Sequence, residues 1–345
     1  AANPESALLV QKARVGKLKQ SNSRDAAAIA AIRSEVERLK SGLPDRVDVF
    51  FVLSSLEEIA GNTAAAEAVL RAAVKECTDA CQAEVELARF LARTARVDLA
   101  IEAARGACER SPDRPAAWVA RAEIELDAGK IDEARATLEK GRDACGEGAG
   151  AREISLKLAA LYLRQDRVAD AVKRLDGLIK QDGSDAGARI ALISVHMSRR
   201  DWVAAQNAIG ELKKIEGEQG PLWRFQQARL WLMGEDWKSR AKEIDELLTR
   251  VIAADPDWDE AAFELGLLCE RLGEWSRAEA VYRRALASHI QSEGLVGRLM
   301  NVLERVGKVD ETKSLLDMIP PDSAMSDFYQ LRVALVTGDL DQAIA

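Results

Sequence analysis

A pattern of small and large apolar residues recurs along this chain about every 34 residues and constrains the fold more than any other feature. The clearest copy is "ELGLLCERLGEWSRAEAVYRRAL", residues 264–286, in which two helical stretches flank a short turn. Further copies begin at residues 83 and 116, as "AEVELARFLARTARVDLAIEAARGACERSPD" and "AAWVARAEIELDAGKIDEARATLEKG". One such helix pair cannot bury its apolar face alone. The repetition therefore predicts a stack of helix pairs that share one continuous core.

The small residues of the pattern predict where helices cross. Two helices joined by a short turn approach closely only where small side chains meet, so we expect Gly266 and Ala278 at the crossing inside one pair. Ala285 is expected to let the next pair approach, while Cys269 and Tyr282 fill the space around the crossing. Ala, Leu, Glu and Arg dominate the sequence and only 8 prolines interrupt it, which favours an all-helical protein.

The spacing resembles the tetratricopeptide repeat family. Its pattern of Leu-Gly, Ala, an aromatic residue and Ala at positions 7, 8, 20, 24 and 27 is matched here by Leu265, Gly266, Ala278, Tyr282 and Ala285. In other units Tyr162 occupies position 11, and position 32 is taken by Pro44, Pro112 and Pro256. The resemblance implies an all-α, right-handed α-solenoid of stacked antiparallel helix pairs.

The units of this pattern give the expected organisation of the chain. Residues 1–46 form an irregular helix pair that continues from a preceding repeat, 47–323 form eight repeats, and 324–345 form a truncated ninth. The repeats are placed at 47–80, 81–114, 115–148, 152–185, 186–219, 221–258, 259–292 and 293–323. The repeat 221–258 has about four extra residues, close to one helical turn, which are expected to lengthen its second helix. Both ends read as the edges of a longer array.

Charge and hydropathy exclude several classes of partner. The net charge of −8 and the pI near 5.2 argue against nucleic-acid binding, which requires a basic surface. No apolar run approaches the roughly 18 residues of a membrane-spanning helix, so direct membrane insertion is not expected. Compartment and oligomeric state are not indicated: the cytoplasm and the periplasm of a bacterium both remain open.

The sequence shows no constellation typical of an enzyme, a cofactor site or a metal site. Its two histidines are far apart: His196 occupies an inward slot expected to be core, and His289 lies near a repeat boundary and is expected to be exposed. Cys77 and Cys81 could form a disulfide in an oxidising compartment or be two half-buried free thiols at a turn. The glycine-rich stretch "ACGEGAGARE" lacks the ending of a phosphate-binding loop.

The resemblance implies that positions 2, 5, 9, 12 and 13 of each repeat point into a concave groove. Along most of the chain these positions alternate in charge, but in 186–258 Arg229 is the only charged one among them. An apolar strip around one arginine suits an extended or helical peptide with an apolar anchor and a carboxylate. The alternative is that these side chains fill a tight superhelical interior. The candidate groove residues are Ile190, Ser194, Met197, Phe225, Arg229, Leu232, Met233, Phe263 and Leu267.

Two further features narrow the function. The Lys and Asn residues with which some family members clamp a C-terminal carboxylate are absent at the matching positions. Trp202, Trp237 and Trp275 share position 17, which favours packing between helices over ligand stacking. We expect a non-catalytic scaffold that binds a protein or peptide ligand. The alternatives are a regulatory or substrate-recruiting arm of a larger enzyme, and a spacer in an envelope or secretion assembly.

Overall fold

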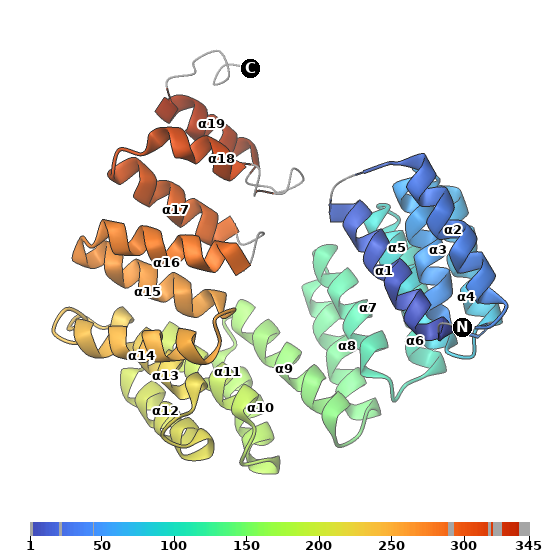
Figure 1. Ribbon diagram of the computed structural model, residues 1–345. Helices are drawn as coiled ribbons and strands as arrows, with labels where there is room; N and C mark the ends of the chain where they lie inside the picture. The colour runs from blue at the N-terminus through green and yellow to red at the C-terminus, as the bar shows by residue number, and fades with distance from the viewer. Residues whose placement is uncertain are drawn as a thin grey trace. The chain divides into compact units, whose positions relative to one another are not determined.

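The computed structural model describes residues 3–20, 23–43, 45–288, 293–316, 319 and 326–337. Within these residues all regular secondary structure is helical, and helices that follow one another in sequence pack as pairs (Figure 1). The predicted all-α stack of helix pairs is therefore confirmed. The chain divides into two compact units, residues 1–178 and 179–345, called below the N-terminal and C-terminal units. The predicted organisation into 1–46, 47–323 and 324–345 remains a prediction.

The N-terminal unit is built from ten helices within the described residues, the last of which continues past its boundary. They are α1 (Pro4–Gln20), α2 (Ala26–Lys40), α3 (Val47–Ile59), α4 (Thr63–Glu76), α5 (Ala80–Arg93), α6 (Val97–Arg110), α7 (Pro115–Asp127), α8 (Ile131–Ala144), α9 (Ala149–Arg164) and α10 (Val168–Gln181). From α3 on, the pairs follow the predicted repeats. The core of the unit consists of apolar side chains from both helices of each pair, such as Phe90 and Ala104.

The C-terminal unit continues the same arrangement. Its elements are α11 (Ala186–Ser198), α12 (Trp202–Glu216), α13 (Pro221–Met233), α14 (Ala241–Ala254), α15 (Asp259–Leu272), α16 (Trp275–Ser288), α17 (Glu293–Arg305), the 3₁₀ turn η1 (Val309–Glu311), α18 (Thr312–Leu316) and α19 (Ser326–Thr337). Helices α11, α13, α15 and α17 are the first helices of their pairs. One large buried cluster runs through this unit from Phe225 to Val333.

Local chemistry fixes where the helices begin and end. The Asp185 and Asp201 carboxylates accept hydrogen bonds from the backbone N–H groups of Ala188 and Ala204, which satisfies free donors in the first turns of α11 and α12. Pro221 occupies the first position of α13, where its missing N–H costs nothing. At the end of α15 the chain turns through Gly273 with φ of +75°, a conformation that favours glycine.

The crossing of α15 and α16 has the predicted small residue at its centre. A Cβ atom added to Gly266 would lie 2.2 Å from Cε1 of Tyr282, so only glycine admits the ring at this distance. Ala278 and Tyr282 are fully buried. The same relation recurs in the N-terminal unit, where a Cβ on Gly141 would lie 2.4 Å from Trp118. The prediction that a small residue lies where the two helices of a pair cross is confirmed at Gly266, whereas Gly141, at the repeat position of Ala285, contacts a helix of its own pair.

The extra residues of the repeat 221–258 do not lengthen a helix, so this expectation is wrong. Helix α14 has 14 residues, as do the second helices α4, α6, α8 and α16. The additional length instead forms an extended turn over residues 234–240, between α13 and α14. The turn begins at Gly234 and ends at Arg240, the N-cap residue of α14.

Candidate functional site

A hollow of about 550 Å³ is lined by the first helices of four successive pairs in the C-terminal unit. We call it the Phe263 groove. Its apolar lining comes from α11, α13, α15 and α17 and consists of Ile190, Leu222, Phe225, Trp258, Phe263 and Leu295. The repeat places these residues together because equivalent positions of successive first helices face the same side. An apolar lining with a few polar groups is typical of a binding site.

The structure brings four of the nine predicted groove residues into this hollow: Ile190, Phe225, Arg229 and Phe263. Phe225 is more buried than expected, with 5% exposure, because its ring packs 4.9 Å from that of Trp258. Ser194 and Leu267 are half-buried and line none of the described hollows of the C-terminal unit. That any of these nine residues contacts a ligand stays a prediction.

Met197 and Leu232 are buried, which corrects the expectation that they expose apolar surface. Each is 3% exposed and packs in the core. Met197 contacts the cluster around Ile209, and Leu232 belongs to the large cluster of the C-terminal unit. Both occupy repeat position 12, which in these two helices faces the partner helix of the pair. Met233, one residue later, is 50% exposed and lines a different hollow.

The charges of the Phe263 groove differ from those expected. Arg229 is joined there by three carboxylates, those of Asp259, Glu260 and Glu264. The Arg229 Nε atom lies 3.5 Å from Oε1 of Glu264, and its guanidinium also lies 5.6 Å from the Phe225 ring centre. Burial raises the pKa of Glu264 above its ordinary value, and the nearby arginines, Arg229 first, offset part of this effect. Arg229 is therefore a half-buried, already paired cation.

Among the groove residues that sequence reasoning missed are Glu264 and Trp258, with Gln226, Asp259 and Leu295. Glu264 follows Arg229 by 35 residues, about one repeat, and this spacing is a signal that could have found the pair. Other ion pairs between successive first helices have the same spacing, including Lys157 with Glu123 at 2.6 Å. Trp258 precedes α15 and lies outside the positions that the repeat pattern assigns to the groove.

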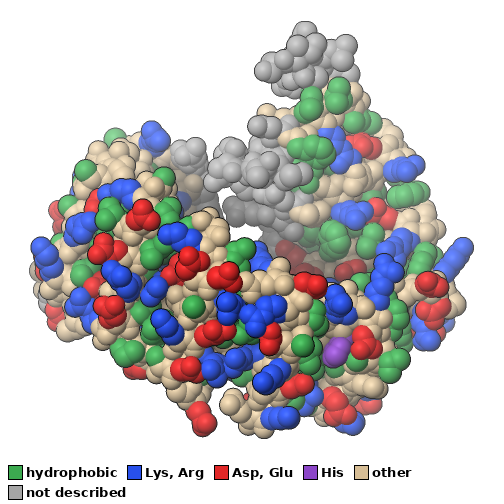
Figure 2. Space-filling view, turned by 180° about the vertical axis from the view of Figure 1, so that it is seen from behind, with side chains coloured by type: hydrophobic (Ala, Val, Ile, Leu, Met, Phe, Trp, Pro, Cys, Tyr) green, Lys and Arg blue, Asp and Glu red, His purple; other side chains and the backbone are tan. Residues whose placement is uncertain are grey.

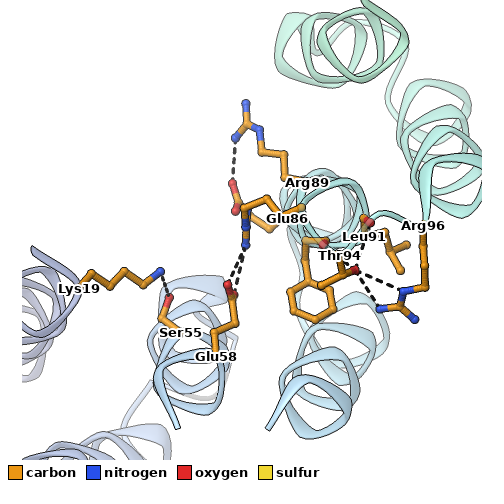
Figure 3. A network of polar contacts seen from close by, with 10 residues as sticks. Lys19, Ser55, Glu58, Glu86, Arg89, Leu91, Thr94 and Arg96 are labelled. Atoms are coloured by element: carbon orange, nitrogen blue, oxygen red, sulfur yellow. Dashed lines mark hydrogen bonds and ion pairs between the residues drawn. The ribbon is translucent and has the colours of Figure 1, made fainter. Parts of the chain in front are cut away.

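In the N-terminal unit the predicted groove charges neutralise one another. Arg93 Nη2 lies 3.2 Å from Oε1 of Glu58, and Arg89 Nη1 lies 2.9 Å from Oε1 of Glu86 on the same helix. Figure 3 shows Glu58, Glu86 and Arg89, together with Lys19, whose ammonium donates to the Ser55 hydroxyl at 3.1 Å. Exposed pairs of this kind contribute little stability. They also leave few charges free for a ligand.

The surface shows a mixture of charges. On the face seen in Figure 2, basic and acidic side chains are interspersed over the surface. Among the helices of the described ranges, none is long and apolar enough to cross a bilayer. The described residues also contain no group of three or more His, Cys, Asp or Glu side chains placed to bind a metal ion.

The cysteines and histidines take no part in the groove. Cys77 and Cys81 are free, buried thiols, so the structure has no disulfide between them. Burial raises the pKa of both thiols, which makes them poor nucleophiles. The His196 side chain is 21% exposed and its Nδ1 lies 3.8 Å from Oδ2 of Asp201. His289 lies outside the described residues.

The tryptophans at repeat position 17 pack between helices, as predicted. Trp275 and Trp237 lie against the large core cluster, and Trp202 lies against the cluster of α11 and α12. Trp202 and Trp237 also line a second hollow, formed around the extended turn 234–240. The sequence did not distinguish these two rings from that of Trp275.

Comparison with known proteins identifies the repeat. The sequence model described as "Tetratricopeptide repeat" matches residues 16–80, 85–149, 156–212 and 246–293, which together make up more than half of the chain. One curated relative is "Cellulose synthase operon protein C" of Pseudomonas fluorescens (strain SBW25), 24% identical over 198 residues. The match covers 55% of this chain but only 15% of that protein's length.

Solved structures show the same fold. A tetratricopeptide repeat protein from Parabacteroides merdae superposes with a TM-score of 0.51 at 15% identity, covering 74% of this chain and 97% of that one. Yeast Tom70 gives a TM-score of 0.58 at 12% identity, covering 83% of this chain and 60% of that one. At these identities the likeness extends to the fold alone. The sequence match, the helix pairs and the glycine crossings together show that this chain belongs to the tetratricopeptide repeat family.

Proposed function

We propose that this chain is a scaffold for protein–protein interaction and that a peptide segment of the partner binds in the Phe263 groove. Membership of the tetratricopeptide repeat family supports the scaffold, because its members act as interaction scaffolds. The observation that carries the finer proposal is the convergence of Ile190, Phe225 and Phe263, from three successive first helices, on one hollow. Helix-borne side chains held by a packed core form a site that is ready before the ligand arrives.

The apolar anchor of the peptide is proposed to lie against Phe263. This ring is half-buried and has the Arg298 guanidinium carbon 5.4 Å from its centre. Phe225 forms the floor and is fixed by Trp258. A side chain of the ligand that enters here loses contact with water over both rings, and buried aromatic contacts of this kind dominate the energetics of interfaces.

The charge of the groove favours a basic side chain next to that anchor. From the sequence we expected a ligand carboxylate at Arg229, but Arg229 already pairs with Glu264. Glu260 is exposed and has no partner among the described residues. A lysine or arginine of the ligand can therefore pair with Glu260 without displacing an internal contact, whereas an acidic ligand meets the carboxylates that line the groove.

Selection from a random peptide library on the full chain tests this proposal. Selected peptides are expected to share an apolar residue beside a basic one, and Phe263→Ala and Glu260→Lys are each expected to weaken their binding at least tenfold, or about 1.4 kcal/mol. Fluorescence anisotropy gives the Kd values. Glu133→Lys on α8, an exposed glutamate without a partner among the described residues, is the matched control. Equal affinity of wild type and Phe263→Ala would exclude the groove.

A second candidate function is a part in an assembly that makes or exports a polysaccharide. The similarity over 198 residues to a protein named for the cellulose synthase operon supports it. Because this chain spans 15% of that relative, the catalytic work of such an assembly is assigned to other proteins or domains. Deleting the gene is expected to reduce surface polysaccharide, with recovery on complementation. Unchanged polysaccharide in the deletion strain would contradict this function.

A further inference from the structure

The extended turn 234–240 creates a second hollow that is separate from the Phe263 groove. Its volume is about 1140 Å³, somewhat above the ~300–1,000 Å³ typical of small-molecule sites. We call it the tryptophan pocket, after the Trp202, Trp231 and Trp237 rings that line it. These rings come from the start of α12, the end of α13 and the turn itself. In the repeats with a short turn, the residue equivalent to Trp237 lies at the start of the second helix, whereas Trp237 lies in the turn.

Each of the three indoles is half-buried, which leaves part of each ring open to the pocket. Two arginines that also line the pocket lie against the rings. The Arg240 guanidinium carbon lies 5.0 Å from the Trp231 ring centre, and Arg240 Nε donates to Oδ2 of Asp236 at 3.0 Å. The Arg271 guanidinium carbon lies 5.5 Å from the ring centre of Trp237. Fixed aromatic rings lose little conformational entropy when a ligand covers them.

The polar groups of the pocket include both hydrogen-bond donors and acceptors. Arg200 and Glu235 are exposed and line the pocket, and their side chains have no hydrogen-bond or ion-pair partner among the described residues. Arg271 donates from Nη1 to the Leu232 carbonyl oxygen at 2.7 Å, which leaves its other N–H groups for a ligand. Three arginines and two carboxylates line the pocket, so its charge is close to balanced. A strongly charged ligand of either sign meets repulsion here.

We propose that the tryptophan pocket binds a neutral oligosaccharide of pyranose rings with equatorial hydroxyl groups. Such a ring has C–H groups on both faces, which stack on an indole, and a rim of hydroxyls that both donate and accept hydrogen bonds. Arg200 and Glu235 are the polar partners for that rim. The proposal is independent of peptide binding in the Phe263 groove.

Arg200 provides a variant that separates binding from folding. Its backbone φ is +58°, in the left-handed region where glycine is favoured. Arg200→Gly therefore relieves strain while it removes the guanidinium. Glu235→Ala removes an exposed carboxylate that makes no internal contact among the described residues. The double variant Arg200→Gly/Glu235→Ala is expected to melt no lower than wild type, so a loss of binding cannot come from unfolding.

Isothermal titration of the full chain with cellohexaose, chitohexaose and maltohexaose tests the proposal. Wild type is expected to bind at least one of these hexasaccharides, whose pyranose rings all carry equatorial hydroxyl groups, with quenching of tryptophan fluorescence. Arg200→Gly/Glu235→Ala is expected to lose at least tenfold in affinity, and Phe263→Ala is expected to bind as wild type does. No binding of any hexasaccharide at millimolar concentration overturns the proposal. The proposal is also overturned if the double variant binds the sugar as tightly as wild type, if Phe263→Ala loses sugar binding, or if a peptide selected for the Phe263 groove displaces the sugar.

Discussion

Adding one methyl group at the crossing of α15 and α16, in Gly266→Ala, tests whether Gly266 sets the distance between the two helices. In Gly266→Ala the new Cβ lies 2.2 Å from Cε1 and 2.3 Å from Cζ of Tyr282, whereas ordinary contacts begin at 3.4 Å. The ring must therefore move by more than one ångström. It is fully buried, and its hydroxyl donates to Oε1 of Glu270 at 2.6 Å, so the movement disturbs both packing and a hydrogen bond.

The magnitude follows from two opposing effects. Overpacking of a close-packed core costs about 1–3 kcal/mol, while replacing glycine by alanine inside a helix stabilises it by about 0.8–1.0 kcal/mol. Gly210→Ala in α12 isolates the second effect, because nothing lies within 4 Å of the Cβ that it adds. We expect Gly210→Ala to stabilise the protein and Gly266→Ala to be less stable than Gly210→Ala by about 1–3 kcal/mol.

Urea unfolding followed by tryptophan fluorescence measures this difference. Six of the seven tryptophans lie in residues 202–275, so the signal reports mainly on the unit that contains both glycines. The urea midpoint of Gly210→Ala should lie above that of wild type and the midpoint of Gly266→Ala should lie below that of Gly210→Ala, while the dependence of the unfolding free energy on urea stays similar. Equal stability of the two variants would refute the claim that Gly266 sets the approach of the helices.

Three further predictions concern other parts of the chain. Burial raises the pKa of Glu264 above 4.5, so between these two values the folded state holds a proton that the unfolded chain has released. The free energy of unfolding should therefore fall as the pH rises from about 4.5 through the raised pKa. Identical pH profiles of wild type and Glu264→Gln in urea titrations would contradict this. A thiol reagent should modify the half-buried Cys145 before the buried cysteines, of which Cys108 has its pKa raised to about 12 by burial; mass mapping that finds Cys108 first would be inconsistent with the core described here. Amides of α19, which exposes Phe328 and Leu335, should exchange faster than those of α15, and equal protection would show an additional contact of α19.

Much of the fold could be predicted because one short pattern specifies each helix pair. Gly266 could be predicted as a crossing from its place in the repeat pattern, whereas the contact of Gly141 with Trp118 of the same pair could not, since that repeat position was expected to face the next pair. The sequence did not predict in the same way that the additional residues form a turn over 234–240. Four residues fit one helical turn by length alone, and the repeat pattern does not specify whether such residues extend a helix or the turn before it.

The candidate site could be predicted in part, for a related reason. Position 5 placed Ile190, Phe225 and Phe263 at one hollow, because the direction of a side chain at this position depends on a single helix. Position 12 was expected to expose apolar surface, but Met197 and Leu232 are buried there, because the rotation of each helix against its neighbours cannot be derived from one repeat. Contacts between repeats, such as Arg229 with Glu264, lie outside any pattern that treats one repeat at a time.

The central claim, that the Phe263 groove is where a partner peptide binds, is tested most directly by photo-cross-linking. A benzoylphenylalanine placed at Phe263, or in a second preparation at the exposed Val203 of α12, is irradiated with a peptide from the library selection. We expect a cross-link from position 263 and only a low cross-linking yield from position 203, with the new bond mapped to the apolar residue of the peptide. Equal yields from the two positions, or a cross-link from position 203 alone, would contradict it.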